Sequence, residues 1–210
     1  GLWTAVAFLL GATFVFFAGT LCFWPNWLPA ALSLPVLTVL LGYSLAKRFT
    51  AWAHYWLGLA LSLAPLCVWV AIRGPVAMEQ PGEWAAVLAL AAGVFFWVGG
   101  FDIIYATMDV EHDVAEGIHS APADFGVGRA LWFARVLHVL SIVSMVGVGV
   151  WAGLAWPYWV AVAACAALLI YEHAIVREDD LSKVNQAFFN VNVILAFLYL
   201  AGVVAALVVA

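Results

Sequence analysis

The sequence has little charge and no metal-type spacing of cysteines. Only 9% of its 210 residues are charged and 68% are hydrophobic, against about 25% and about 45–50% in an average soluble domain. Seven Lys and Arg against twelve Asp and Glu form no basic patch, which argues against a nucleic-acid partner. The three cysteines lie in apolar runs without CxxC or His-Cys spacing, so they predict neither disulfides nor a zinc site. This composition excludes a soluble enzyme and predicts a protein surrounded by lipid.

Long apolar runs dominate what remains. A transmembrane helix needs about 20 mostly apolar residues, and alternating strand patterns are absent, which favours a helical bundle over a membrane barrel. The expected fold is all-α, a multi-pass transmembrane helical bundle, with a single domain over residues 1–210. The seven expected spans are 2–23, 28–46, 53–72, 84–107, 130–151, 156–174 and 188–209.

Cationic residues concentrate in every second connection between these spans. Among the seven Lys and Arg residues, only Arg73 falls in the other set of connections. By the positive-inside rule, the cationic connections face the cytoplasm. The sequence therefore predicts an integral protein of the bacterial inner (plasma) membrane, with any site formed by these connections on the cytoplasmic side.

The fourth span continues into the acidic segment FDIIYATMDVEHD. In one unbroken helix at about 100° per residue, Asp109 and Asp113 return to within about 20° of Asp102. Tyr105 borders this stripe, whereas Glu111 points away. Acidic residues near hydrocarbon are costly, and three in phase predict a site for a hard divalent cation, with Mg²⁺ as the cofactor. A proton relay in a transporter is the alternative use.

Further polar residues lie near the same membrane face. Tyr43 and Lys47 are four residues apart on one helix face, which predicts phosphate binding at Lys47. Arg129 is either a membrane anchor or an anion ligand. Asn190 and Asn192 are either helix–helix contacts or site residues. Three histidines are expected to be interface or packing residues: His54, His138 and His173.

One long motif resembles that of a known family. It reads DxxYAxxDxxxDxxxGxxSxPxxFG and begins at Asp102. It resembles the second aspartate-rich motif of the UbiA-type intramembrane prenyltransferases. The YxxxK pair at Tyr43 and the segment YEHAIVREDDLSKVNQAFFN from Tyr171 support the resemblance. The chain is most similar to the 4-hydroxybenzoate polyprenyltransferase branch, including the enzymes assigned to futalosine-route menaquinone synthesis.

The resemblance implies a nine-helix bundle in which Mg²⁺ ions hold the diphosphate of a polyprenyl donor. The substrates would be a polyprenyl diphosphate and a hydroxy-aromatic acid, with no obligate protein partner. Asp109 and Asp113 would be metal ligands, and Asp102 either a ligand or a catalytic acceptor that polarises the aromatic substrate. Tyr43 and Lys47 would be catalytic residues at the diphosphate. The remaining expected substrate-binding residues are Tyr105, Arg129, Asn190 and Asn192.

The family's first aspartate motif is absent from these residues. Seven spans and a first residue other than Met predict a chain that lacks two N-terminal helices and is inactive alone. The alternatives are a related prenyltransferase with another acceptor (homogentisate, haem or chlorophyllide), an ion-coupled transporter and an inactive fragment.

Overall fold

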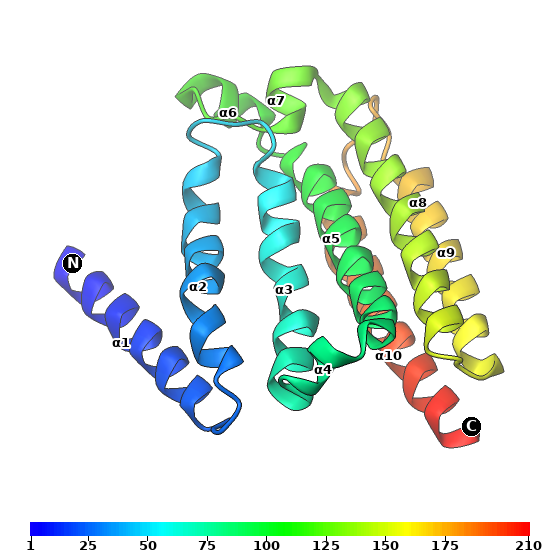
Figure 1. Ribbon diagram of the computed structural model, residues 1–210. Coiled ribbons are helices and arrows are strands. Elements are labelled where there is room, and N and C mark those ends of the chain that lie inside the picture. The colour runs from blue at the N-terminus through cyan, green and yellow to red at the C-terminus, as the bar shows by residue number, and fades with distance from the viewer.

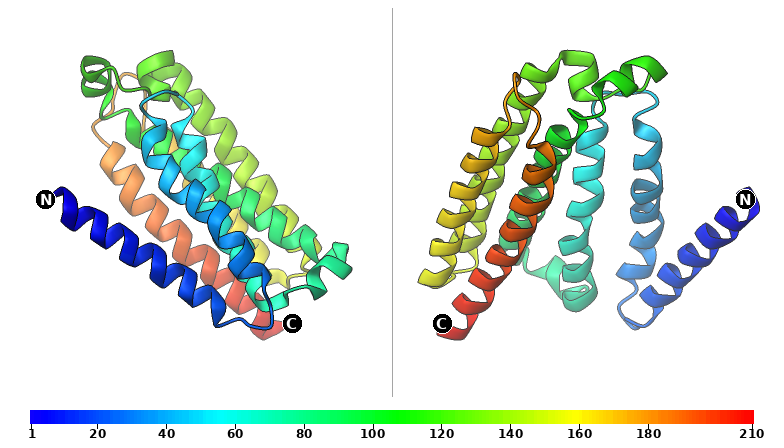
Figure 2. Two further views of the ribbon diagram at one scale, coloured as in Figure 1. Left: turned by 60° about the vertical axis from the view of Figure 1, so that its left-hand side comes forward. Right: turned by 180° about the vertical axis from the view of Figure 1, so that it is seen from behind.

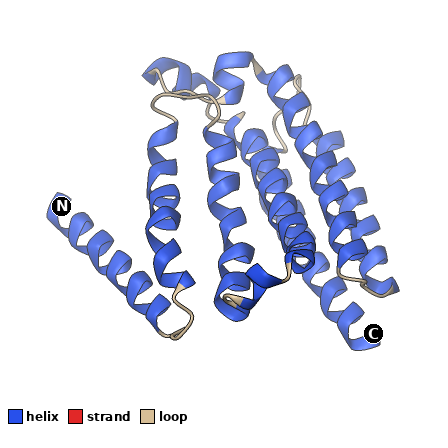
Figure 3. Cartoon of the chain, viewed as in Figure 1, coloured by secondary structure: helices blue, strands red, loops and turns tan.

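The chain is a bundle of helices joined by short connections (Figure 3). The computed structural model describes residues 1, 3–76 and 78–210. Within these residues there is no strand, and seven helices are long and apolar enough to cross a membrane. The predicted fold class, an all-α multi-pass bundle, is confirmed.

The helix ends lie within a few residues of those expected from hydropathy. The spanning helices are α1 (Leu2–Leu21), α2 (Leu28–Ala46), α3 (Ala53–Arg73), α5 (Trp84–Ala106), α8 (Val127–Trp151), α9 (Trp156–Ile175) and α10 (Asn192–Val209). The shorter helices are α4 (Val76–Glu79), η1 (Pro81–Glu83), α6 (Val110–Glu116), α7 (Ala121–Phe125) and the π-helical segment η2 (Gln186–Val191).

Successive spanning helices run in opposite directions, and each packs against the next (Figure 1). Helices α5, α8, α9 and α10 form the thickest part of the bundle, and α3 and α2 extend it to one side. Helix α1 inclines away from α2, and none of its described residues is buried (Figure 2). The cation-rich connections, together with α6 and α7, gather at the upper end of Figure 1, which we call the charged end.

Two groups of apolar side chains form the core. One lies under the connections of the charged end and includes Ile103, Ile104 and Leu131. The other lies between α5, α8, α9 and α10 and includes Met145 and Leu195. The charged end therefore rests on a packed apolar base.

The expected unbroken helix through Asp102, Asp109 and Asp113 is wrong. Helix α5 ends at Ala106, and α6 begins again after Asp109. The backbone N–H of Asp109 donates to Ala106 O at 3.2 Å, three residues back, and the Thr107 hydroxyl donates to Ile104 O at 2.7 Å. Short polar side chains compete for backbone groups in this way and favour helix ends. The three carboxylates therefore do not share one continuous helix face.

The contact between α3 and α5 depends on a glycine. A methyl group added at Gly58 of α3 would lie 2.6 Å from the backbone oxygen of Phe95 in α5. Real carbon atoms do not approach a carbonyl oxygen so closely, so any larger side chain must push the two helices apart. In lipid, helices associate through such close contacts between small residues.

We expect Gly58→Ala to lower the free energy of unfolding in detergent micelles by about 1–3 kcal/mol, the usual cost of overpacking. Gly11→Ala is the matched control, because nothing lies within 4 Å of a methyl group at that position. Its helix propensity should make it neutral or slightly stabilising. Equal unfolding curves for both variants in a reversible SDS titration would contradict the assigned contact.

Candidate functional site

A small cavity with several polar side chains lies at the charged end, between α2, α3 and α5. Its volume is about 200 Å³, and its lining includes Tyr43, Lys47 and Asp102. Tyr43 and Lys47 stand one turn apart at the end of α2, as their spacing predicted. The structure thus brings a cation, a phenol and a carboxylate, all predicted site residues, to one cavity.

Asp102 is held by His54, one of the three histidines expected to be interface or packing residues. His54 lies in the first turn of α3 and is fully buried. Its Nδ1 is 2.7 Å from Oδ2 of Asp102, and its Nε2 accepts a hydrogen bond of 3.1 Å from the backbone N–H of Ala121. Asp102 itself remains partly accessible, with 22% of its side chain exposed. His54 is thus buried between helices, as expected of an interface or packing residue, but its contact with Asp102 was not part of that expectation.

The sequence did contain a signal for this pair. His54 is the second residue of its span, and Asp102 lies four residues before the end of an antiparallel neighbouring span. Both are therefore at the same depth below the charged end. Comparing the depths of ionisable residues across neighbouring spans would have paired them.

The other two carboxylates of the motif lie on α6. Asp109 is the N-cap residue of this helix, is exposed, and makes no side-chain capping bond. Asp113 follows one turn later and is buried, and its Oδ2 has no hydrogen-bond partner. Among the described residues, no three His, Cys, Asp or Glu side chains converge as a metal site. The structure therefore offers a pair of carboxylates, separate from Asp102.

A buried carboxylate oxygen without a partner is costly, and a bound cation would remove that cost. Mg²⁺ is commonly held by one or two carboxylates, several waters and phosphate oxygens of the substrate. The donor set of Asp109 and Asp113 fits such an ion.

The segment after α6 is tied down at several points. Gly117, with a φ of +64°, ends α6 in the left-handed conformation that glycine adopts without strain. The backbone N–H of His119 then donates to Lys47 O at 2.8 Å. The hydroxyl of Ser120 caps α7 by accepting from the N–H of Ala123 at 3.3 Å. The motif that follows Asp113 thus anchors α7 to the ends of α2 and α3.

The predicted substrate-binding residues are dispersed. Tyr105 stacks on Phe188 of η2 with ring centroids 4.3 Å apart, and Asn190 is exposed on the same π-helical segment. Arg129 is exposed in the first turn of α8. None of these three lines the cavity of Lys47 and Asp102.

The side chain of Asn192 is used inside the bundle. Its Oδ1 accepts from the indole N–H of Trp97 at 2.7 Å. Its Nδ2 donates to Glu172 Oε1 at 3.2 Å and to the backbone oxygen of Phe188 at 3.0 Å. An amide with these partners joins helices, which was the alternative to a substrate-binding role for this residue.

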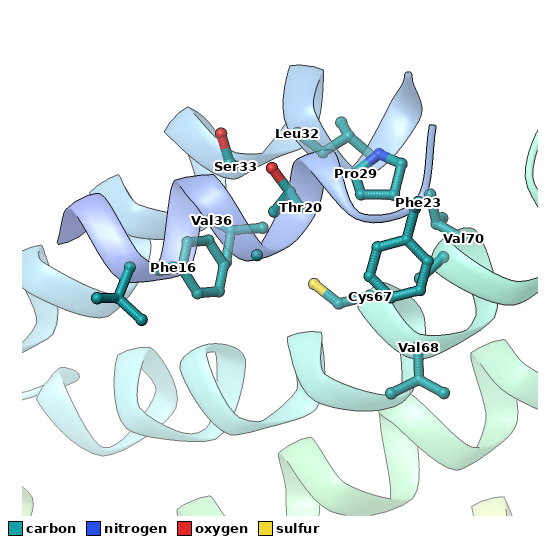
Figure 4. A pocket seen from close by; sticks show the side chains of 13 residues that line it. Phe16, Thr20, Phe23, Pro29, Leu32, Ser33, Val36, Cys67, Val68 and Val70 are labelled. Carbon is teal, nitrogen blue, oxygen red and sulfur yellow. The ribbon is translucent and has the colours of Figure 1, made fainter. Parts of the chain in front are cut away.

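Larger cavities lie elsewhere: the one between α8 and α9, of about 560 Å³, includes Arg135, His138 and His173 in its lining, and the others are lined mainly by apolar side chains. One of about 430 Å³ lies between α1, α2 and α3, toward the end of the bundle opposite the charged end (Figure 4). The oxygens that it shows belong to Thr20 and Ser33, and both hydroxyls donate to backbone carbonyls of their own helices. This cavity presents no charged group and adds nothing to the chemistry of the charged end.

Comparisons with known proteins agree with this arrangement. The model of the UbiA prenyltransferase family matches residues 2–200. The chain is 31% identical over 155 residues to the mitochondrial 4-hydroxybenzoate polyprenyltransferase of Caenorhabditis elegans, covering 74% of the chain and 42% of that protein. It is 30% identical over 194 residues to the 4-hydroxybenzoate octaprenyltransferase of Burkholderia mallei, covering 90% of the chain and 63% of the relative. The matched part of the chain thus spans 42% and 63% of the length of these two relatives.

A solved structure shares the fold. The apo structure of a UbiA homolog from Aeropyrum pernix K1 superposes with a TM-score of 0.83 at 28% sequence identity, covering 98% of this chain and 73% of that one. With seven apolar helices, the chain is an integral membrane protein. The match of the family model over nearly the whole length agrees with the helical architecture and the acidic motif at Asp102: the chain belongs to the UbiA prenyltransferase family.

Proposed function

We propose that this chain takes part in the transfer of a polyprenyl group from a polyprenyl diphosphate to a hydroxy-aromatic acid similar to 4-hydroxybenzoate. The observation that carries the proposal is the cavity in which Lys47, Tyr43 and Asp102 meet at the charged end. The relatives named as 4-hydroxybenzoate polyprenyl- and octaprenyltransferases support this choice of substrates. The step would support ubiquinone synthesis, and menaquinone synthesis with a dihydroxynaphthoate acceptor is the variant that the sequence motifs favour.

Lys47 and Tyr43 are proposed to bind the diphosphate. Lys47 is half-buried at the end of α2, where an ammonium group forms short charge-assisted hydrogen bonds with phosphate oxygens. Tyr43, one turn earlier, donates its phenolic hydrogen to the same group. These contacts strengthen as negative charge develops on the leaving diphosphate.

Asp109 and Asp113 are proposed to hold the metal ion. Enzymes of the family are generally metal-dependent for binding the prenyl diphosphate. When bound, Mg²⁺ neutralises charge on the diphosphate and makes it a better leaving group. The exposed carboxylate of Asp109 and the unpartnered Oδ2 of Asp113 are the free ligands that α6 supplies.

Asp102 is proposed to act on the aromatic acceptor rather than on the metal. It lies in the cavity with Lys47, and His54 already occupies its Oδ2. The other oxygen would accept the hydrogen bond of the substrate hydroxyl, which makes the neighbouring ring carbon more nucleophilic. When the C–O bond to the diphosphate breaks, the prenyl chain would be left as an allylic cation, the ring carbon beside the hydroxyl would bond to it, and the proton of that ring carbon would pass to the released diphosphate. Apolar residues such as Leu57 line the same cavity and exclude water that would compete for the cation.

Three residues outside the cavity remain proposed as substrate contacts. They are Tyr105, which lies against η2, Asn190 on η2, and Arg129 in the first turn of α8. The cationic connections support a cytoplasmic orientation of the charged end. A bacterial inner membrane would be the location of such a site.

The first test separates an enzyme from a transporter. Membranes from cells expressing the natural gene, given radiolabelled polyprenyl diphosphate and 4-hydroxybenzoate, should form a lipid-extractable prenylated acid only when Mg²⁺ is present. EDTA should abolish the product, and added Mg²⁺ should restore it. Uptake that collapses with the proton gradient, without any prenylated product, would instead establish the transporter.

A second test addresses the ligand pair on α6. We expect Asp113→Asn to lower turnover by about a hundredfold or more, because it removes an anionic ligand from the metal that stabilises the leaving group. Glu111→Gln is the matched control, since Glu111 is exposed on the same helix. The two variants should keep similar thermal stability. Undiminished turnover of Asp113→Asn at limiting Mg²⁺ would remove this residue from the site.

A third test addresses completeness of the ligand set. Asp109 and Asp113 suit one Mg²⁺ ion, whereas the resemblance implies more than one ion at the diphosphate, and a second near-octahedral ion needs oxygen ligands that these two residues do not supply. We therefore expect the 210-residue chain by itself to form little product compared with the protein expressed from its natural gene. Equal turnover by the two, measured per mole of folded protein, would show that the carboxylates described above suffice.

A further inference from the structure

His54 connects two parts of the site through its two ring nitrogens. The residue is fully buried. One nitrogen, Nδ1, contacts Oδ2 of Asp102 on α5 at 2.7 Å. The other, Nε2, is 3.1 Å from the backbone nitrogen of Ala121, the first residue of α7. A single imidazole therefore lies between the carboxylate in the cavity and the segment that covers the charged end.

These contacts determine which ring nitrogen carries the proton. A backbone N–H can only donate, so Nε2 of His54 must accept through its lone pair. The proton then resides on Nδ1 and is donated to Asp102. A proton on Nε2 would place two donors face to face in a buried position, where an unmade hydrogen bond is expensive. The geometry thus selects the neutral ring with Nδ1–H.

The contact with Ala121 reaches the metal-binding helix as well. Helix α7 follows α6, which carries Asp109 and Asp113, after a short connection. That connection is also held by the bond from the N–H of His119 to Lys47 O. A movement of α7 would therefore change the positions of Lys47, Asp102 and α6.

We propose that His54, as its Nδ1–H tautomer, is a positioning residue that orients the Asp102 carboxylate and docks α7 at the charged end. The effect of His54 on turnover rests on the proposed prenyl transfer. Its tautomer and its hydrogen bond to α7 can be tested whether or not that function is correct.

Two amide substitutions separate the two contacts. In His54→Asn, the amide nitrogen stands at the position of Nδ1, so donation to Asp102 is retained and the acceptor for Ala121 is lost. In His54→Gln, the amide oxygen reaches the position of Nε2, so the acceptor for Ala121 is retained and the donor to Asp102 is lost. His54→Ala removes both contacts. His112→Asn is the control, because His112 is exposed on α6.

Amide hydrogen exchange of residues 118–124 in nanodiscs tests the docking of α7. We expect His54→Asn and His54→Ala to exchange at Ala121 at least about tenfold faster than the unchanged protein, since the N–H loses its acceptor. His54→Gln and His112→Asn should exchange at the original rate. Equal exchange in all four variants would overturn the docking role.

Nitrogen-15 spectra of protein labelled at histidine test the tautomer. The chain has five histidines, and the His54 signals are those lost in His54→Asn. We expect Nδ1 to appear as the protonated nitrogen and Nε2 as the unprotonated one. A protonated Nε2 would overturn the assignment.

Turnover separates positioning of Asp102 from docking of α7. We expect His54→Gln to lower kcat by about tenfold or more while the affinity for polyprenyl diphosphate stays unchanged, and His54→Asn to recover most of that loss. Normal kcat in His54→Gln would overturn the orienting role. These rates are measured on the protein expressed from its natural gene, and if that protein without substitutions forms no prenylated product, the proposed function fails, whereas exchange and tautomer still decide the role of His54.

Discussion

The close approach of α5 to its neighbours is the contact on which the other features depend. Lipid gives apolar helices no hydrophobic reason to associate, so tight packing must hold them. Small residues provide it: Gly58 lies against the backbone of α5, and Gly100 of α5 lies against the ring of His138 on α8. Because α5 also carries Asp102, any change in this packing would move the carboxylate relative to Lys47 on α2. The position of Asp102 relative to Lys47 is therefore fixed by how closely α5 packs against its neighbouring helices.

Burial in lipid also explains where the remaining polar groups are found. A buried polar group without a partner costs free energy, and polar side chains of four helices therefore gather in the interior, where His138 Nε2, Glu172 Oε2 and His173 Nδ1 still have no hydrogen-bond partner. A chain of contacts joins Trp97, Asn192 and Glu172, and Nδ1 of His138 lies 3.0 Å from Nε2 of His173 and 3.5 Å from Oε2 of Glu172. These residues come from α5, α8, α9 and α10, so the network fixes the relative rotation of four helices. It thereby holds α5, the helix that carries Asp102, without contributing a side chain to the cavity.

Sequence patterns predicted the spans well because the hydrophobic requirement of a membrane acts on every residue of a span. They also placed Tyr43 and Lys47 together, since an i,i+4 pair within one helix needs no tertiary information. The course of the chain after Ala106 was predicted wrongly. Periodicity treats the helix as continuous, whereas the turn at Thr107 depends on local competition for backbone carbonyls. The contact of His54 with Asp102 was missed because it joins two helices, and only their relative placement reveals it.

The turn after Ala106 separates the carboxylates of the acidic motif into two groups. On a continuous helix, Asp102, Asp109 and Asp113 would form one anionic stripe with strong mutual repulsion. The turn instead leaves Asp102 in the cavity under the control of His54 and places the other two on α6, a separate helix. Among the described residues, no ion pair involves Asp109 or Asp113, which suit a metal-bound diphosphate. Asp102 is oriented by a neutral donor and suits an uncharged hydroxyl. One short motif thus places its carboxylates in two different environments, the cavity and α6. Helix α7 follows α6 and is hydrogen-bonded to His54, so it links the two.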